Sequence, residues 1–255
     1  MDATVPMKRL AKKGLGRLGY ELVRKNRDSE FFDISSEDMK IIRAVRSFTM
    51  TSTERLHALM QAVRYVEGNS ILGDIVECGV WKGGSMMLVA KVLMSLGSMD
   101  KNLWLFDTYT GMPRPSEVDV SPTEGRALKL FSAKRTGSNT SNWCYASLGE
   151  VQRAMYGTGY PTSKIHFVQG LVEETIPGAA PARLAILRLD TDWYASTRHE
   201  LVHLFPRLSH GGVLMIDDYG HWRGARLATD GYFTEHKLHF LLNRIDYTGR
   251  IGVKI

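Results

Sequence analysis

Two pairs of aspartates in the second half of the chain could hold a metal ion. The pairs are Asp190 with Asp192, and Asp217 with Asp218, and each lies at the end of an apolar stretch that is typical of a buried strand. Because neighbouring strands lie ~4.8 Å apart, carboxylates at matching strand ends can converge on one point. A divalent cation relieves their mutual repulsion, and ligands that are all oxygen favour Mg²⁺ or Mn²⁺ over zinc. We therefore predict Asp190, Asp217 and Asp218 as metal ligands.

Such a cation can serve to activate an alcohol. Coordination lowers the pKa of a sugar or phenolic hydroxyl and fixes its orientation, so that a nearby base can remove the proton. We assign Asp192 as this base and keep Asp190 as the second catalytic residue, because only two positions separate them and their roles could be exchanged. His221 is a competing base. Alternatively, one of the aspartates caps the helix that follows.

A glycine-containing turn earlier in the chain predicts a nucleoside site. Residues 74–85 run from an apolar strand through the turn into a helix, and the turn contains Gly79, Gly83 and Gly84. Their spacing does not fit the G-x-G-x-x-G pattern of dinucleotide sites. Glu77 would repel a phosphate but attract an ammonium group, and Asp107 at the end of the next strand can accept both ribose hydroxyls. S-adenosylmethionine is therefore favoured, unless the glycines only pack the helix against the sheet.

Strand and helix patterns alternate from residue 74 onward. The predicted strands cover residues 74–78, 103–107, 165–169, 184–189 and 213–217, and the predicted helices cover 36–50, 53–67, 85–96, 147–156 and 196–208. This order is typical of an α/β fold with a Rossmann-like, doubly wound, mostly parallel sheet and helices on both faces. Ligands bind at the carboxyl edge of such a sheet, which is where the aspartates fall.

Residues 111–145 interrupt the alternation. They are rich in Pro, Ser, Thr and Gly, and they contain Trp143 and Tyr145. Long irregular segments within compact domains are often functional loops. We predict that this segment forms a lid over the substrate.

The excess positive charge lies near the amino-terminal end. Residues 1–27 hold eight basic and two acidic side chains, which leaves 25 of each for the rest of the chain, so a nucleic-acid groove is disfavoured. Within residues 7–25, apolar positions recur at helical spacing between lysines and arginines. This pattern indicates either a solvated tail or a peripheral contact with the inner face of a membrane. We divide the chain into an appendage, residues 1–33, and a catalytic domain, residues 34–255.

The cysteine count and the hydropathy pattern suggest where the protein resides. Two cysteines, Cys78 and Cys144, are too few for a disulfide framework. No apolar run approaches the ~20 residues that span a bilayer, and the start of the chain lacks a signal-peptide pattern. We expect a cytoplasmic protein, with a homo-oligomer as the default assembly.

Several motifs together resemble the macrocin O-methyltransferase family, whose members methylate sugar hydroxyls of bacterial natural products. They are TMTS at residues 49–52, GDIVECGVWKGGS at 73–85, FDTYTGMP at 106–113, QG at 169–170, TIP at 175–177, LDTDWY at 189–194 and GGVLMIDDY at 211–219. The resemblance implies a class I methyltransferase fold and transfer of a methyl group from S-adenosylmethionine. It also implies Mg²⁺ at Asp190, Asp217 and Asp218.

The same resemblance implies a set of cofactor-binding residues. They are Met50, Thr51, Glu77, Gly79, Trp81, Ser85, Asp107, Gly170 and Val172, with Val172 beside the adenine. The chain is also similar in plan to catechol and caffeoyl-CoA methyltransferases. In the latter plan a base follows the first metal aspartate by a few residues, which here corresponds to Asp192.

The acceptor does not follow from the resemblance, because the basic start of the chain and residues 114–145 differ from antibiotic-tailoring members. We expect a saccharide, either a natural-product glycoside or a surface glycan that could be lipid-linked. A second function class also remains open. Asp190-Thr191-Asp192 matches the D-x-D pattern with which some glycosyltransferases hold a metal and a nucleotide sugar.

Overall fold

The computed structural model describes residues 31–255 of the chain. The chain divides into two compact units, Met1–Ser36 and Glu37–Ile255, and the architecture below is that of the second unit. The amphipathic helix predicted within residues 7–25 lies outside the described residues, and the domain boundary after residue 33 stays a prediction. None of the helices in residues 31–255 combines the length and the apolar character needed to cross a bilayer.

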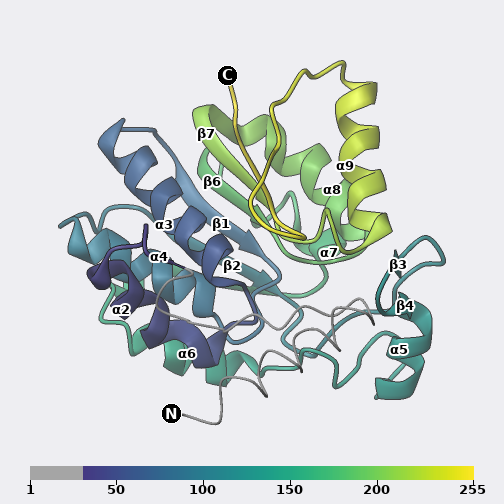
Figure 1. Ribbon diagram of the computed structural model, residues 1–255. Helices are drawn as coiled ribbons and strands as arrows, with labels where there is room; N and C mark the ends of the chain where they lie inside the picture. Colours follow the sequence, from purple (N-terminus) through teal and green to yellow (C-terminus); the bar gives the residue numbers. More distant parts are fainter. Residues whose placement is uncertain (1–30) are drawn as a thin grey trace, which may run out of the picture. The chain divides into compact units, whose positions relative to one another are not determined.

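A seven-stranded sheet forms the centre of this unit, in the order β5-β2-β1-β6-β7-β9-β8 (Figure 1). The strands are β1 (Asp74–Cys78), β2 (Leu103–Asp107), β5 (Ile165–Gln169), β6 (Leu184–Leu189), β7 (Leu208–Ile216), β8 (Asn243–Arg244) and β9 (Arg250–Val253). The first five strands of that order pair in parallel, whereas β9 pairs antiparallel with both β7 and β8. The predicted α/β fold with a mostly parallel sheet is confirmed. The antiparallel edge was not predicted.

Helices pack on both faces of the sheet. They are α2 (Ser36–Val45), α3 (Thr53–Gly68), α4 (Gly84–Ser95), α6 (Leu148–Tyr156), α7 (Val172–Thr175), α8 (Tyr194–Leu204) and α9 (Arg223–Glu235). In Figure 1, α3 and α4 lie on one side of the strands, and α8 and α9 lie on the other. Every residue of β6 is buried, as expected for a central parallel strand that is covered on both faces.

The register of the strands sets the position of the site. Cys78 is aligned with Phe106 on one side and with Leu189 on the other, and Leu189 is aligned with Ile216. The residues that follow these four positions therefore emerge together at the carboxyl edge of the sheet. They are Gly79, Asp107, Asp190 and Asp217.

The insertion at residues 111–145 is partly ordered, which corrects the expectation of an irregular segment. It contains a short hairpin, β3 (Val120–Ser121) with β4 (Gly125–Arg126), and the helix α5 (Ala127–Lys134), and it is fixed at both ends. The Met112 N–H donates to Trp143 O (2.8 Å), and the ring of Trp143 packs against Trp193 and Trp222. The buried Asp119 accepts from the Tyr194 N–H at the start of α8 (2.8 Å). The segment is thus packed onto the domain as well as placed beside the cavity described below.

Candidate functional site

The turn after β1 folds around the carboxylate of Asp107. One oxygen of Asp107 accepts from the backbone N–H groups of Val80 (2.7 Å) and Trp81 (3.0 Å), and the other accepts from Tyr109 (2.7 Å). Burial raises the pKa of Asp107, while these three hydrogen bonds act in the opposite direction. Since a carboxylate offers about four acceptor sites, Asp107 orders the turn and still has capacity for one further donor.

Gly79 brings the turn into direct contact with the aspartate strand. Its φ is +84°, and a Cβ built at this position would lie 1.9 Å from Asp190 O. No side chain fits there. The glycine that the sequence singles out for ligand approach therefore also packs the turn against the backbone of Asp190.

A cavity of about 440 Å³ opens beside this turn. Eight of the nine predicted cofactor residues line it: Met50, Thr51, Gly79, Trp81, Ser85, Asp107, Gly170 and Val172. The same cavity is lined by Asp190, Asp192, Asp217 and Asp218, and by residues of the insertion such as Met112, Glu124 and Trp143. One space therefore adjoins both the predicted cofactor residues and the acidic cluster.

Glu77, the ninth residue, is not among the lining residues. It is 1% exposed and forms an ion pair with Arg188 through Oε1, while its Oε2 has no hydrogen-bond partner among residues 31–255. Burial raises the pKa of Glu77 to about 8, and the charge of Arg188 acts against this shift. The structure thus corrects the expectation of a carboxylate that is free to attract an ammonium group.

Arg188 is a site residue that the sequence reasoning missed. Its guanidinium donates to Glu77, to Asp190 Oδ2 (2.7 Å), to Asp217 Oδ1 (2.5 Å) and to Thr51 Oγ1 (3.0 Å), and the side chain is 2% exposed. One buried cation therefore joins β1, β6, β7 and the segment that precedes α3. The sequence does contain a signal for it, namely an arginine between two leucines within an apolar strand. A buried arginine is rarely without charged or polar partners, so this position indicates a buried network of charges.

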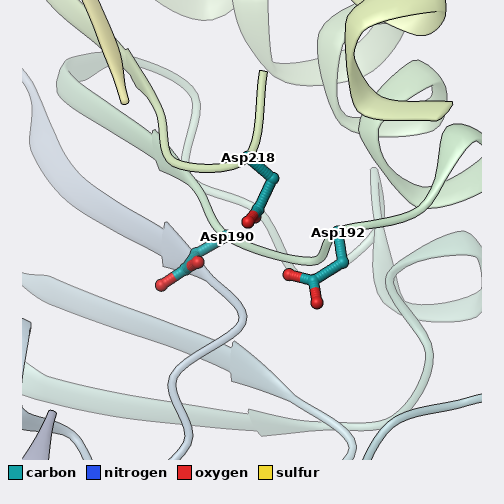
Figure 2. Close-up of side chains that lie close together, drawn as sticks. All are labelled: Asp190, Asp192 and Asp218. Carbon is teal, nitrogen blue, oxygen red and sulfur yellow. The ribbon is translucent and has the colours of Figure 1, made fainter. Parts of the chain in front are cut away.

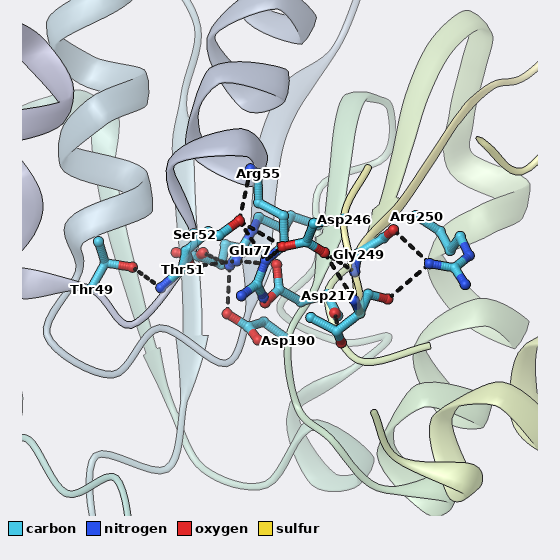
Figure 3. Close-up of polar contacts among 12 residues, drawn as sticks. Thr49, Thr51, Ser52, Arg55, Glu77, Asp190, Asp217, Asp246, Gly249 and Arg250 are labelled. Atoms are coloured by element: carbon cyan, nitrogen blue, oxygen red, sulfur yellow. Dashed lines mark hydrogen bonds and ion pairs between the residues drawn. The ribbon is translucent and has the colours of Figure 1, made fainter. Parts of the chain in front are cut away.

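Asp217 points into this network of charges (Figure 3). Its Oδ2 forms an ion pair with Arg55, and its Oδ1 pairs with Arg188. Arg55 Nε also donates to Asp246 Oδ2 (3.0 Å), and Asp246 accepts from Ser52 Oγ (2.6 Å) at the start of α3. Both carboxylate oxygens of Asp217 are thus engaged by arginines, which sets it apart from the acidic cluster described next, and its role as a metal ligand stays a prediction.

Asp190, Asp192 and Asp218 form the acidic cluster, with one carboxylate oxygen from each lying within 4.8 Å of the others. Figure 2 shows the three side chains close together at the ends of β6 and β7. Asp192 has a φ of 69°, a backbone conformation that is uncommon for a residue with a side chain and often marks a functional site. Asp192, and not Asp217, therefore lies in the cluster with Asp190 and Asp218.

The electrostatics of the cluster fit a bound cation. Burial and the neighbouring Asp218 raise the pKa of Asp192 well above its usual value, and burial and Asp190 raise that of Asp218 to about 7. Asp218 Oδ2 is buried and has no hydrogen-bond partner among residues 31–255. Three crowded carboxylates, one with an unsatisfied oxygen, are the kind of ligand set that hard divalent cations prefer.

His221, the competing base, also lines the cavity. Its Nε2 lies 3.3 Å from Glu124 Oε1, and its Nδ1 lies 3.2 Å from the hydroxyl of Tyr247. Glu124 and Tyr247 were not singled out from the sequence. They come from the insertion and from the segment before β9, so only the folded chain brings them to His221.

Comparison with known proteins identifies the chain. Residues 20–251 match the family described as Macrocin-O-methyltransferase (TylF). The chain belongs to the macrocin O-methyltransferase family. It is similar to the 8-demethyl-8-(2,3-dimethoxy-alpha-L-rhamnosyl)-tetracenomycin-C 4'-O-methyltransferase of Streptomyces olivaceus, with 35% identity over 79% of this chain and 73% of that protein. The demethyldecarbamoylnovobiocin O-methyltransferase of Streptomyces niveus is 31% identical over the same shares.

Solved structures agree with this assignment. The O-methyltransferase NovP superimposes with a TM-score of 0.71 at 31% identity, over 81% of this chain and 82% of NovP. The calicheamicin methyltransferase CalS11, with a TM-score of 0.61 at 18% identity over 86% of this chain and 93% of CalS11, shares the fold. This macrocin O-methyltransferase family member is therefore an S-adenosylmethionine-dependent O-methyltransferase. The glycosyltransferase alternative, which depended on a three-residue match, is not favoured.

Proposed function

We propose that the protein transfers the methyl group of S-adenosylmethionine to a hydroxyl of a saccharide, with a divalent cation at the acidic cluster. The relatives support a sugar acceptor, since their names describe methylation of a rhamnosyl tetracenomycin and of a mycinamicin. The observation that carries the proposal is the shared cavity. It brings the Asp107 turn and the cluster of Asp190, Asp192 and Asp218 to the same space.

The cofactor residues have separable tasks in this proposal. Asp107 accepts a ribose hydroxyl with the capacity that its three backbone hydrogen bonds leave free. Gly79 lets the cofactor approach the backbone, and Val172 lies beside the adenine. Glu77 acts indirectly through Arg188, whose other contact, Thr51, lines the cavity.

The acidic cluster supplies the groups that act on the acceptor. Asp190 and Asp218 would hold Mg²⁺ or Mn²⁺, which when bound lowers the pKa of an adjacent alcohol. Asp192, which lies in the cluster and lines the cavity, receives the proton of the acceptor hydroxyl. The hydroxyl oxygen forms a bond to the methyl carbon while the carbon–sulfur bond breaks, leaving S-adenosylhomocysteine and a methyl ether.

A labelled-methyl assay tests the proposal. The purified full chain is incubated with S-adenosylmethionine carrying a labelled methyl group and a panel of neutral sugar glycosides and phenols, once with Mg²⁺ and once with a chelator. We expect transfer to glycosides with Mg²⁺ and its loss on chelation. S-adenosylhomocysteine should also raise the melting temperature, because a ligand that binds only the folded state stabilises it. Full transfer in chelated buffer would refute the role of the cation, and transfer to phenols alone would refute the sugar acceptor.

The physical state of the acceptor is a separate part of the proposal. The concentration of positive charge in residues 1–27 supports an acceptor presented at an anionic membrane surface. Co-sedimentation with anionic liposomes, comparing the full chain with a chain that lacks residues 1–27, tests this point. Equal binding by the two proteins would leave a water-soluble glycoside as the acceptor.

A further inference from the structure

The cavity has a side that the cofactor residues and the acidic cluster do not account for. Glu124 and Trp143 come from the insertion, His221 precedes α9, and Tyr247 precedes β9. None of these four residues lies directly at the end of a strand of the parallel sheet. They are brought together because Asp119 ties the hairpin to the start of α8 and Trp143 packs on Trp193 and Trp222.

His221 is held in one orientation at this side. Its ring meets Trp222 edge to face, with 4.9 Å between centroids, and both ring nitrogens have partners in Glu124 and Tyr247. Its side chain is 18% exposed, whereas that of Glu124 is 47% exposed. His221 thus holds the Glu124 carboxylate and the Tyr247 hydroxyl in place on the cavity wall, and both of these groups keep hydrogen-bonding capacity for the hydroxyls of a ligand.

The charges of the cavity restrict what can bind there. The lining carries seven carboxylates: Asp107, Glu124, Glu173, Asp190, Asp192, Asp217 and Asp218. Among the lining residues of the described chain, Arg55 is the only arginine or lysine, and its ion pairs with Asp217 and Asp246 already occupy it. Even with a divalent cation at the acidic cluster, the seven carboxylates outnumber the positive charges of the lining. An acceptor that bears a phosphate or carboxylate would therefore meet like charges and find no unpaired arginine or lysine among the lining residues.

We propose that Glu124, His221 and Tyr247 form the acceptor subsite, and that they bind the hydroxyls of an uncharged sugar ring whose apolar face lies against Trp143. This assignment rests on the proposed function, which it extends by naming the residues that position the acceptor. The sugar therefore reaches the enzyme as a neutral glycoside. A glycosyl-transfer reaction must come first, because a nucleotide-activated sugar carries a diphosphate.

Substitutions matched in chemistry test the subsite. Glu124→Gln removes a carboxylate charge, and His221→Gln removes an imidazole ring. The controls Glu117→Gln and His239→Gln make the same two changes at positions that do not line the cavity. Glu117 is a suitable control because it is 73% exposed and lies just before the same hairpin. Steady-state kinetics are measured with the neutral glycoside of highest turnover, and the affinity for S-adenosylhomocysteine is measured by calorimetry.

We expect the two subsite variants to raise the KM for the acceptor about tenfold, the effect of losing one hydrogen bond to a charged group. Their kcat should stay within about threefold, their affinity for S-adenosylhomocysteine should not change, and both controls should match the unmodified protein. An acceptor that differs only by a carboxylate should be methylated at least about tenfold less efficiently than its neutral counterpart. Unchanged KM values, or equal use of the charged acceptor, would overturn the assignment.

Failure of the proposed function would look different. If S-adenosylhomocysteine does not bind, or if no acceptor in the panel is methylated, the proposed function itself is in error. The subsite is then tested directly by saturation-transfer NMR with methyl α-L-rhamnopyranoside in the presence of Mg²⁺. Signals from the ring protons that weaken in His221→Gln but not in His239→Gln would support the subsite, and absence of signals in the unmodified protein would overturn it.

Discussion

Replacing Gly79 with alanine should damage the site from a position that carries no functional group. An added Cβ would lie 1.9 Å from Asp190 O, whereas real Cβ atoms are essentially never closer than 3.0 Å to another heavy atom. Relieving the contact requires a relative displacement of about 1.1 Å, which is the difference between these distances. Asp190 N also donates to Cys78 O (2.8 Å). The segments after β1 and β6 therefore cannot move apart without breaking the hydrogen bonds between these two strands.

The expected loss of activity follows from the size of this displacement. A catalytic group that is misplaced by ~1 Å can cost about a hundredfold in rate, or roughly 2.7 kcal/mol of transition-state stabilisation. Asp190 belongs to the acidic cluster, so we expect kcat/KM for Gly79→Ala to fall by about this factor. Stability should also fall by roughly 1–2 kcal/mol, because alanine disfavours a positive φ.

Gly97→Ala separates the contact from the backbone strain. Gly97 has a φ of +71°, and a Cβ at this position would have no heavy atom within 4 Å. Both variants therefore carry the same conformational cost, and only Gly79→Ala carries the clash. The assays are urea unfolding for stability and labelled-methyl transfer for activity. If Gly79→Ala keeps kcat/KM within about threefold of Gly97→Ala, the inferred tight coupling between the turn and Asp190 is wrong.

Three further predictions concern the buried charges. Asp218→Asn should weaken Mn²⁺ binding, measured by electron paramagnetic resonance, at least about tenfold more than Asp217→Asn, because only Asp218 belongs to the cluster; equal weakening would contradict this division. Arg188→Met should destabilise the protein by about 3–5 kcal/mol in urea unfolding, since it leaves the buried Glu77 without its ion-pair partner and removes one partner from Asp190 and from Asp217, and a loss below 1 kcal/mol would count against the network. Burial raises the pKa of Glu200 from 4.5 to about 8. The proton that Glu200 binds in the folded state therefore makes its full contribution to the free energy of unfolding below about pH 4.5, and this contribution is lost as the pH rises through 8. Glu200→Gln should reduce the fall in unfolding free energy across this window by up to about 1.4 kcal/mol per pH unit, and an unchanged slope would show that Glu200 does not hold that proton.

The parallel part of the fold follows from the sequence because each strand is a short apolar run between turn residues. Four of the five predicted strands have the observed bounds. The fifth, β7, runs from Leu208 to Ile216, because Leu208 pairs with Leu184 ahead of a shift in register and regular pairing resumes at Val213. The antiparallel strands β8 and β9 could not be predicted from the same signal. β8, at the edge of the sheet, has two exposed residues, and β9 has four residues of which only Gly252 is buried.

The placement of Asp217 illustrates a limit of reasoning from sequence position. Neighbouring residues of an extended chain point to opposite sides, so Asp217 and Asp218 cannot both face one point while the strand geometry persists. In the structure Asp218 turns toward Asp190, and Asp217 turns toward Arg55 and Arg188. The alternation of side chains along an extended chain would by itself predict that the two aspartates face opposite sides. Which of them joins Asp190 depends on the arginines, and Arg55 comes from a helix more than 150 residues away.

The reassignment of Glu77 follows from strand order, which a single sequence does not reveal. β6 lies beside β1, although β2 and β5 come between them in the chain, and this order aligns Glu77 with Arg188. A carboxylate and a guanidinium at aligned positions inside a sheet will pair, because either charge would be costly to bury alone. Arg188 in turn contacts Asp190 in the acidic cluster and Thr51 on the cavity wall. The Glu77 carboxylate is thus paired with Arg188, which holds residues of the cavity wall in place, and it is not free to bind an ammonium group.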